Sequence, residues 1–118
     1  MFLPVPHERV ELVEVLGPDG TGDDQLVAIW EADEAQAALT LVAGLPEGEL
    51  KRCFIPVWKI RAHSGTRFLF EISFCFRCHG ARLRGPAVPP EQDTIHAFDS
   101  EDSTSRELLA RLKAAGQS

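Results

Sequence analysis

The chain has 118 residues, of which 44% are apolar and 25% charged, and its formal net charge is −6 at pH 7. A chain of this length and composition forms one globular domain, residues 1–118, and is too apolar to be disordered. The excess of acidic residues argues against a nucleic-acid-binding protein, because phosphate contacts need clustered Lys and Arg.

The first part of the chain predicts two strands and a helix. Residues 8–16 are rich in Val and Leu and end at a Gly-Pro-Asp-Gly turn, and residues 26–30 form a second apolar run of strand length. Apolar residues then recur at helical spacing, namely Ala35, Ala38, Leu39 and Val42. We expect Asp33 to cap this helix and Gly44 to end it.

Two further strands are predicted over residues 53–62 and 67–78, with Gly65 in the left-handed position of the loop between them. The second strand alternates, and its apolar face carries Phe68, Phe70, Ile72, Phe74, Phe76 and Cys78. A three-residue loop places Lys59 opposite Glu71 as a cross-strand ion pair.

The C-terminal part predicts one more strand and one more helix. His79 and Gly80 form a two-residue turn, after which residues 81–84 return antiparallel. Residues 85–103 contain three prolines and are expected to be a surface loop. Thr104 begins a capping box for a last helix with the apolar stripe Leu108, Leu109, Leu112 and Ala115.

The predicted order of elements is therefore β-β-α-β-β-β-α. Two amphipathic helices need an apolar surface to cover, and the aromatic face of the strands supplies it. We expect an α+β fold, a two-layer sandwich of a mostly antiparallel sheet with both helices packed on one face. Pro56 has no N–H to donate, so its strand lies at an edge or is interrupted there. The predicted core contains Trp58, Phe70, Ile72, Phe74, Phe76, Leu83, Leu39, Val42, Leu108 and Leu112.

The three cysteines carry the main candidate motif, as Cys53-Phe-x-Pro and Cys75-Phe-Arg-Cys78-His79. C-x-x-C-H is the attachment signature of c-type haem, but the chain has no internal Met to serve as an axial ligand. If the strand alternation continues to residue 78, Cys75 and Cys78 point to opposite faces, with Cys78 in the core. Covalent haem is therefore not expected, and the motif would be a buried Cys beside a turn.

Two chemical alternatives for the cysteines stay open. Zinc knuckles are built from a C-x-x-C at a turn. A structural zinc requires four ligands, and only Cys53 plus His79 or His63 remain to complete the set, so no metal site is favoured. Alternatively, Cys53 and Cys75 share the polar face as a redox pair, where the guanidinium groups of Arg77 and Arg84 would stabilise a thiolate.

The spacing of the cysteines resembles that of a group of small bacterial proteins. The shared pattern is R-C-F-x-P with an Ile four residues after the Pro, followed by F-C-F-x-C, a short strand and a Leu-rich helix, here from Lys51 to the C-terminus. Members of that group often carry Arg-His-Gly after the Pro, where this chain has Val57, Trp58 and Lys59. The resemblance implies a fold but no reaction and no cofactor.

Basic side chains are expected to gather on the solvent face of the strands, and they form a candidate patch for an anion or an acidic partner: Lys59, Arg61, Arg77, Arg82 and Arg84. A half-exposed sheet also carries such charges without binding anything. The acidic residues Asp99, Glu101 and Asp102 precede the last helix, where capping explains them better than metal binding.

Compartment and function follow from what the sequence lacks. The N-terminus shows no secretory signal and no apolar run approaches the ~20 residues that span a bilayer, so we expect a cytoplasmic protein with reduced thiols and no membrane contact. No nucleophile or acid–base constellation stands out. We therefore expect a non-enzymatic interaction or accessory protein that binds an unknown protein partner through the exposed sheet face, without a cofactor. The alternative is a thiol-redox or zinc protein that uses Cys53, Cys75 and Cys78.

Overall fold

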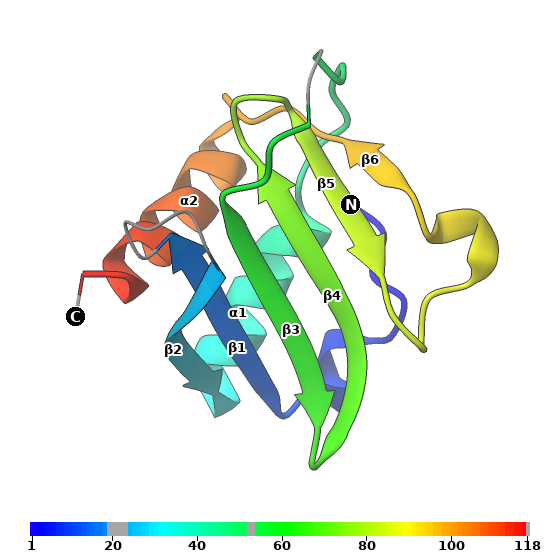
Figure 1. Cartoon of the computed structure of the whole chain (residues 1–118), viewed down its shortest axis with the longest axis vertical. Coiled ribbons are helices and arrows are strands. Elements are labelled where there is room, and N and C mark those ends of the chain that lie inside the picture. The colour runs from blue at the N-terminus through cyan, green and yellow to red at the C-terminus, as the bar shows by residue number, and fades with distance from the viewer. Residues whose placement is uncertain (19–23, 52–53, 118) are drawn as a thin grey trace.

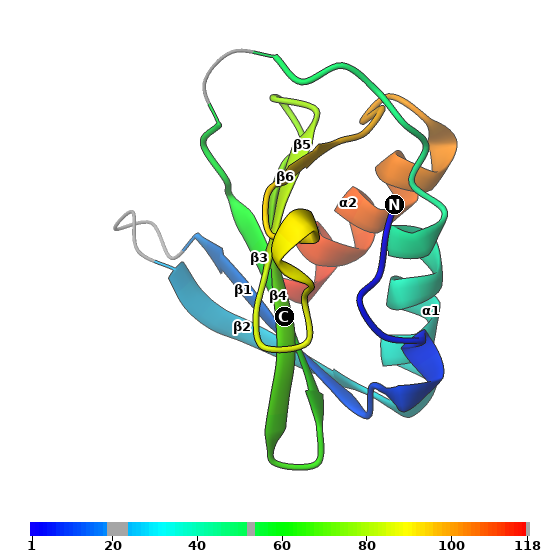
Figure 2. The same cartoon turned by 90° about the vertical axis from the view of Figure 1, so that its right-hand side faces the viewer.

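A computed structural model describes residues 1–18, 24–51 and 54–117, and these residues form two layers (Figure 1). One layer is a six-stranded antiparallel sheet, and the other consists of two α-helices. Figure 2 shows the sheet nearly edge-on, with both helices on the same side of it. The predicted α+β sandwich is confirmed. The sheet face that is turned away from the helices is called the open face below.

The sheet has the strand order β2-β1-β3-β4-β5-β6, with β2 at one edge and β6 at the other (Figure 1). The strands are β1 Leu12–Pro18, β2 Asp24–Glu31, β3 Trp58–Ser64, β4 Arg67–Cys75, β5 Gly80–Arg84 and β6 Ile95–Ala97. β3 begins only after Pro56 and lies in the middle of the sheet, so the proline interrupts the predicted strand rather than marking an edge. β6 lies inside the segment that was predicted to be a loop.

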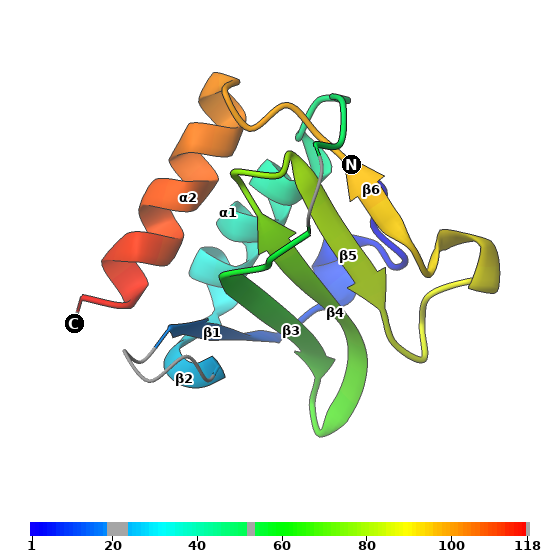
Figure 3. The same cartoon turned by 45° about the horizontal axis from the view of Figure 1, so that its top comes forward.

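The helices are α1 Ala32–Ala43 and α2 Ser103–Ala115, and they pack against each other behind the sheet (Figure 3). Short 3-10 helices cover His7–Arg9 and Pro90–Gln92. α1 buries the four residues of the predicted stripe, because the helical period of 3.6 brings them to one side: Ala35, Ala38, Leu39 and Val42.

Both predicted N-caps are wrong by two residues. α1 begins after Glu31, which makes no side-chain capping bond, so Asp33 lies inside the first turn. α2 begins after Asp102, whose carboxylate accepts a hydrogen bond of 2.9 Å from the backbone N–H of Thr104. An acidic residue therefore caps α2, and its negative charge suits the N-terminal end of the helix dipole. Thr104, the predicted cap, instead donates its backbone N–H to this carboxylate.

The hydrophobic core lies between the sheet and the helices, as predicted. Eight of the ten predicted residues are fully buried there, while Trp58 and Phe76 are partly buried and pack against the same cluster. Phe98 is also fully buried, and its ring meets Phe74 edge-on at 6.4 Å and Phe76 at 5.5 Å between centroids. The segment just after β6 thus closes the core with an aromatic side chain.

The β3–β4 pairing differs from the predicted register by two residues. Ala62 pairs with Phe70, but the next residue, His63, pairs with Phe68, so Leu69 is the extra residue of a β-bulge. Because the shift is even, residues from Phe70 onward keep their predicted face. Phe68, however, moves from the core face to the open face.

Candidate functional site

Glu71 lies at the centre of the open face, although only 6% of its surface is exposed. Arg61 on β3 and Arg84 on β5 are its direct cross-strand neighbours. The Nε of Arg61 donates to Oε1 of Glu71 at 2.9 Å, and the Nε of Arg84 donates to Oε2 at 2.7 Å. A single carboxylate thus joins three strands, with one guanidinium on each side.

The predicted pair of Lys59 with Glu71 is a secondary contact. Lys59 pairs in register with Ser73, and its Nζ lies 3.9 Å from Oε1 of Glu71. The same Nζ donates to the carboxylate of Asp24 on β2 at 2.7 Å. The two-residue register shift therefore gives Arg61 the position opposite Glu71 that the sequence analysis assigned to Lys59.

The surroundings of Glu71 act on its pKa in opposite directions. Burial is the largest influence and by itself raises the pKa of the carboxyl. Hydrogen bonds from Arg61 and Arg84, together with the positive charge of Lys59, outweigh burial and hold the pKa of Glu71 below its usual value. Glu71 is therefore an anion near neutral pH, and the guanidinium pair is held in place by it.

Both guanidinium groups keep donors for a further ligand. Each contacts Glu71 through Nε, and among the described residues no hydrogen bond engages their terminal nitrogens. The side chains of Arg61 and Arg84 are 41% and 54% exposed. Arg61, Arg84 and Glu71 together carry a net charge of one positive unit. The planar guanidinium group of Arg can donate two parallel hydrogen bonds to a carboxylate or a phosphate.

These groups line a hollow of about 400 Å³ on the open face, whose wall is formed by Glu14, Arg61, His63, Phe68, Glu71, Arg84 and Gly85. Nε2 of His63 lies 2.6 Å from Oε1 of Glu14, so this second carboxylate already has a partner. The ring of His63 also lies 5.7 Å from the ring of Phe68, centroid to centroid. The hollow thus has two cationic donors at one end and an aromatic wall beside them.

The other three basic residues of the predicted patch, Lys59, Arg77 and Arg82, do not line this hollow, and of these only Lys59 lies close to Glu71. Arg82 lies on the open face but binds Asp93 through Nη2 at 2.5 Å. Arg77 is exposed in the turn after β4. It lies six positions after Glu71, beyond the end of the strand and roughly 13 Å or more along the sheet. Of the five residues in the predicted patch, Lys59, Arg61 and Arg84 are thus the ones that surround Glu71.

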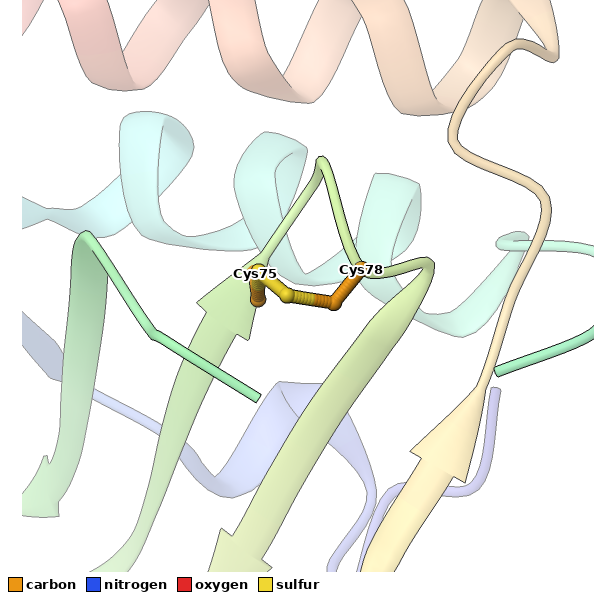
Figure 4. Close-up of a disulfide and its surroundings, with 2 residues drawn as sticks. All are labelled: Cys75 and Cys78. Atoms are coloured by element: carbon orange, nitrogen blue, oxygen red, sulfur yellow. A yellow bond between two sulfur atoms is a disulfide. The ribbon is translucent and has the colours of Figure 1, made fainter. Parts of the chain in front are cut away.

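The cysteines adopt an arrangement that the sequence analysis did not predict. β4 ends at Cys75, and residues 76–79 form a four-residue turn, called the cysteine turn below, before β5 begins at Gly80. The side chains of Cys75 and Cys78 point toward each other across this turn and form a disulfide, with the Cα atoms 5.1 Å apart (Figure 4). Diverging thiols were expected because the strand alternation was extended three residues too far.

The predicted return strand is shifted for the same reason. Ala81 pairs with Phe74 and Leu83 with Ile72, because the four-residue turn replaces the predicted two-residue turn at His79 and Gly80. Cys78 is buried as predicted, but as a disulfide partner, and Cys75 is buried as well rather than exposed on the polar face. Cys53, which was considered as a zinc ligand or as the partner of Cys75, lies outside the described residues.

His79 ends the cysteine turn in a left-handed backbone conformation with φ of +55°. Its Nδ1 accepts a hydrogen bond of 3.4 Å from the N–H of Ser100, and its carbonyl accepts one of 3.0 Å from the N–H of Phe98. These bonds give His79 a role in holding the segment before α2. Within residues 1–18, 24–51 and 54–117, no three His, Cys, Asp or Glu side chains are grouped closely enough to hold a metal ion.

The sequence contained some of the signals for this site. Lys59, Arg61 and Arg84 were placed on one face by alternation alone, and Glu71 shares that face. The role of Phe68 was missed, because only the bulge at Leu69 brings it to the open face. The link between Glu14 and His63 was also missed, since β1 and β3 are separated by a strand and a helix.

Comparisons with protein-family models, curated proteins and solved structures found no match to this chain. Among the described residues, no helix is long and apolar enough to cross a membrane.

Proposed function

We propose that this protein is an interaction protein whose open face holds an anionic group of a protein partner. The observation that carries the proposal is the pair Arg61 and Arg84, whose side chains are fixed by one buried carboxylate through Nε and are still 41% and 54% exposed. Preorganised donors bind an anion at a lower entropic cost than free arginine side chains do. The cluster of Arg61, Arg84 and Glu71 carries a net positive charge, whereas the whole chain is acidic.

The partner group enters the hollow rather than resting on a flat surface. A hollow of about 400 Å³ accommodates one side chain or one chain end. The helices cover the opposite face of the sheet, so the open face remains accessible to a second protein (Figure 2). The proposed role requires no cofactor and no reaction.

The experiment is a titration of the ¹⁵N-labelled protein with sodium acetate, against sodium chloride at equal ionic strength. Acetate has few atoms, so its dissociation constant should be on the order of millimolar. Amide shifts should be largest in β3, β4 and β5 around Glu71. Arg84→Gln and Arg61→Gln should each weaken the shifts severalfold, whereas Arg77→Gln, which removes an exposed arginine outside the hollow, should not. Shifts spread evenly over the surface, or unchanged in the Arg84→Gln protein, would refute the proposal.

The disulfide between Cys75 and Cys78 favours a second candidate, a thiol–disulfide protein of the cytoplasm. Reducing compartments keep most thiol pairs open, and the disulfides that do form there are usually catalytic or redox-sensing. In this candidate a dithiol reductant transfers two electrons and two protons to the bond, giving two thiols and an oxidised reductant. Zinc binding through these cysteines would require the same reduction, because the ligand is the thiolate.

This candidate is tested by equilibrating the protein in glutathione buffers of graded potential and counting maleimide-reactive thiols by mass spectrometry. A Cys53→Ser variant isolates the Cys75–Cys78 pair. A midpoint within the cytosolic glutathione range supports a redox role. A bond that remains closed far below that range identifies a structural disulfide. Zinc content after reduction, measured on the same samples, tests the metal alternative.

A further inference from the structure

The hollow on the open face has a cationic part and an aromatic part. A site that bound only small anions would need no aromatic part. At one end are the partly exposed side chains of Arg61 and Arg84. Beside them stands Phe68, a partly exposed aromatic ring that the bulge at Leu69 turns away from the core. Its neighbour His63 is tilted by 52° against it, so the Phe68 ring is supported from one side.

The charges in the hollow favour a singly charged anion over a doubly charged one. Arg61, Arg84 and Glu71 together carry one net positive charge. Glu14, which contacts His63, adds a second carboxylate to the wall, so the arginines and glutamates of the lining balance in formal charge. A doubly charged phosphate group would be repelled by both carboxylates more strongly than a carboxylate would be. A carboxylate also matches the fork of one guanidinium in a bidentate contact.

We infer that the group held in the hollow is the carboxyl-terminal aromatic residue of a partner chain, an inference that rests on the proposed function. The terminal carboxylate accepts hydrogen bonds from Arg61 and Arg84, while the ring of the same residue packs on Phe68. An internal residue offers either a ring or a carboxylate, and only a chain end offers both in one unit small enough for a hollow of about 400 Å³. Aromatic pairing adds to the affinity beyond the buried area.

Three small probes separate the contributions of ring and charge. N-acetyl-phenylalanine carries both groups, N-acetyl-glycine carries only the carboxylate, and N-acetyl-phenylalanine amide carries only the ring. In titrations of the ¹⁵N-labelled protein, N-acetyl-phenylalanine should bind about tenfold more tightly than either of the others. Its shifts should include Phe68 and His63 as well as the residues around Glu71.

Variants assign each contribution to its residue. Phe68→Leu keeps an apolar side chain at a partly exposed position, so the fold should persist, and the ¹⁵N spectrum verifies this. It should weaken N-acetyl-phenylalanine severalfold and leave N-acetyl-glycine unchanged. Arg84→Gln should weaken both carboxylates and leave the amide unchanged. Arg77→Gln serves as the matched control and should change none of the three.

The outcomes distinguish the inference from the proposed function. If N-acetyl-glycine binds the hollow as tightly as N-acetyl-phenylalanine, the site binds anions and the aromatic ring adds nothing to the affinity. The inference is then overturned, while the proposed function stands. If the amide binds as tightly as the acid, the site reads the ring alone and the inference fails. If neither carboxylate perturbs β3–β5, both proposals fail.

Discussion

The indole of Trp58 lies across Gly17 and occupies the space that a side chain at position 17 would need. A Cβ built on Gly17 would overlap the six-membered ring of Trp58, with Cε3 at 2.9 Å. The same ring also meets the end of α2, where a Cβ on Gly116 would lie 3.1 Å from Cη2. β1, β3 and α2 therefore meet through one aromatic ring, which requires a glycine on the β1 side.

The first prediction is that Gly17→Ala destabilises the protein by about 1–3 kcal/mol, because the indole ring or the strand must shift to admit the methyl group. The free energy of unfolding is measured by urea denaturation followed by tryptophan fluorescence. Gly44→Ala is the matched control, since the added Cβ would come no closer than 3.5 Å to any atom at a helical φ of −87°. Equal stability of the two variants would show that the Trp58 ring moves freely.

The second prediction concerns the β3–β4 loop, where Gly65 has a φ of +59° and a Cβ would meet nothing within 4 Å. Gly65→Ala should therefore cost about 1–2 kcal/mol through backbone strain alone. Gly65→Asn should cost less, because asparagine tolerates the left-handed region better than alanine. Thermal denaturation of both variants provides the comparison, and an alanine variant as stable as the parent would contradict the left-handed turn.

The third prediction is that Phe74→Ala costs about 3–5 kcal/mol, because the ring is fully buried and packs against Phe76 at 5.6 Å as well as against Phe98. Phe68→Ala, which removes an aromatic ring of the same strand from the open face, should cost less than half as much. Chemical denaturation of the pair measures the difference. Similar losses would mean that the open face is covered in the folded protein.

The fourth prediction follows from the low pKa of Glu71 and is a loss of stability in acid. Burial opposes this shift, but the hydrogen bonds of Arg61 and Arg84 and the charge of Lys59 prevail. A carboxyl whose pKa is lower in the folded state stabilises the fold above the unfolded value of about 4.5, and this contribution is lost as the pH falls through the folded value.

The check is the urea midpoint between pH 7 and pH 3 for the parent and for Glu71→Gln. We expect the variant to be less stable at pH 7 by about 1–3 kcal/mol and to lose less stability in acid. Glu49→Gln, at an exposed loop position, serves as the control and should follow the parent. Parallel curves for the parent and the Glu71→Gln protein would show that Glu71 does not cause the acid sensitivity.

The fifth prediction concerns the Cys75–Cys78 disulfide. It closes a very short loop, so its removal should destabilise the protein by only about 2 kcal/mol. The double variant Cys75→Ser, Cys78→Ser should therefore still fold, with a lower midpoint in urea than the oxidised parent. Adding a reductant should lower the midpoint of the parent to a similar value and leave that of the double variant unchanged.

Periodicity in the sequence predicted the core well, because it depends on which residues share a face. Leu39 and Val42 share one side of α1, and Phe70, Ile72 and Phe74 share one side of β4, whatever their exact partners are. A register error of two residues leaves these faces unchanged. The fold class therefore followed from local patterns.

Features that depend on the count of residues in a turn were predicted less well. The sequence Phe-Arg-Cys-His continues an apolar–polar alternation, so nothing local marks the end of β4 at Cys75, and the disulfide was missed with it. The bulge at Leu69 likewise sets which residue faces Glu71. β6 has only three residues and is defined by its pairing with β5, which no periodicity of its own reveals. The candidate site lies where these counts matter, so its basic residues Arg61 and Arg84 were predicted, but Phe68, the contact of Glu14 with His63 and the geometry were not.

The strand order has a consequence for how the chain folds. β2 and β1 are neighbours in the sequence, and so are β3, β4, β5 and β6. Among the described strands, the pairing of β1 with β3 is the one contact that spans α1. The strands within each half of the sheet can therefore pair early. The pairing of β1 with β3, called the seam below, forms more slowly because it requires the closure of a longer loop. We expect amide protons of this seam to exchange together with the global unfolding event, and refolding to be limited by the joining of the two halves rather than by either hairpin.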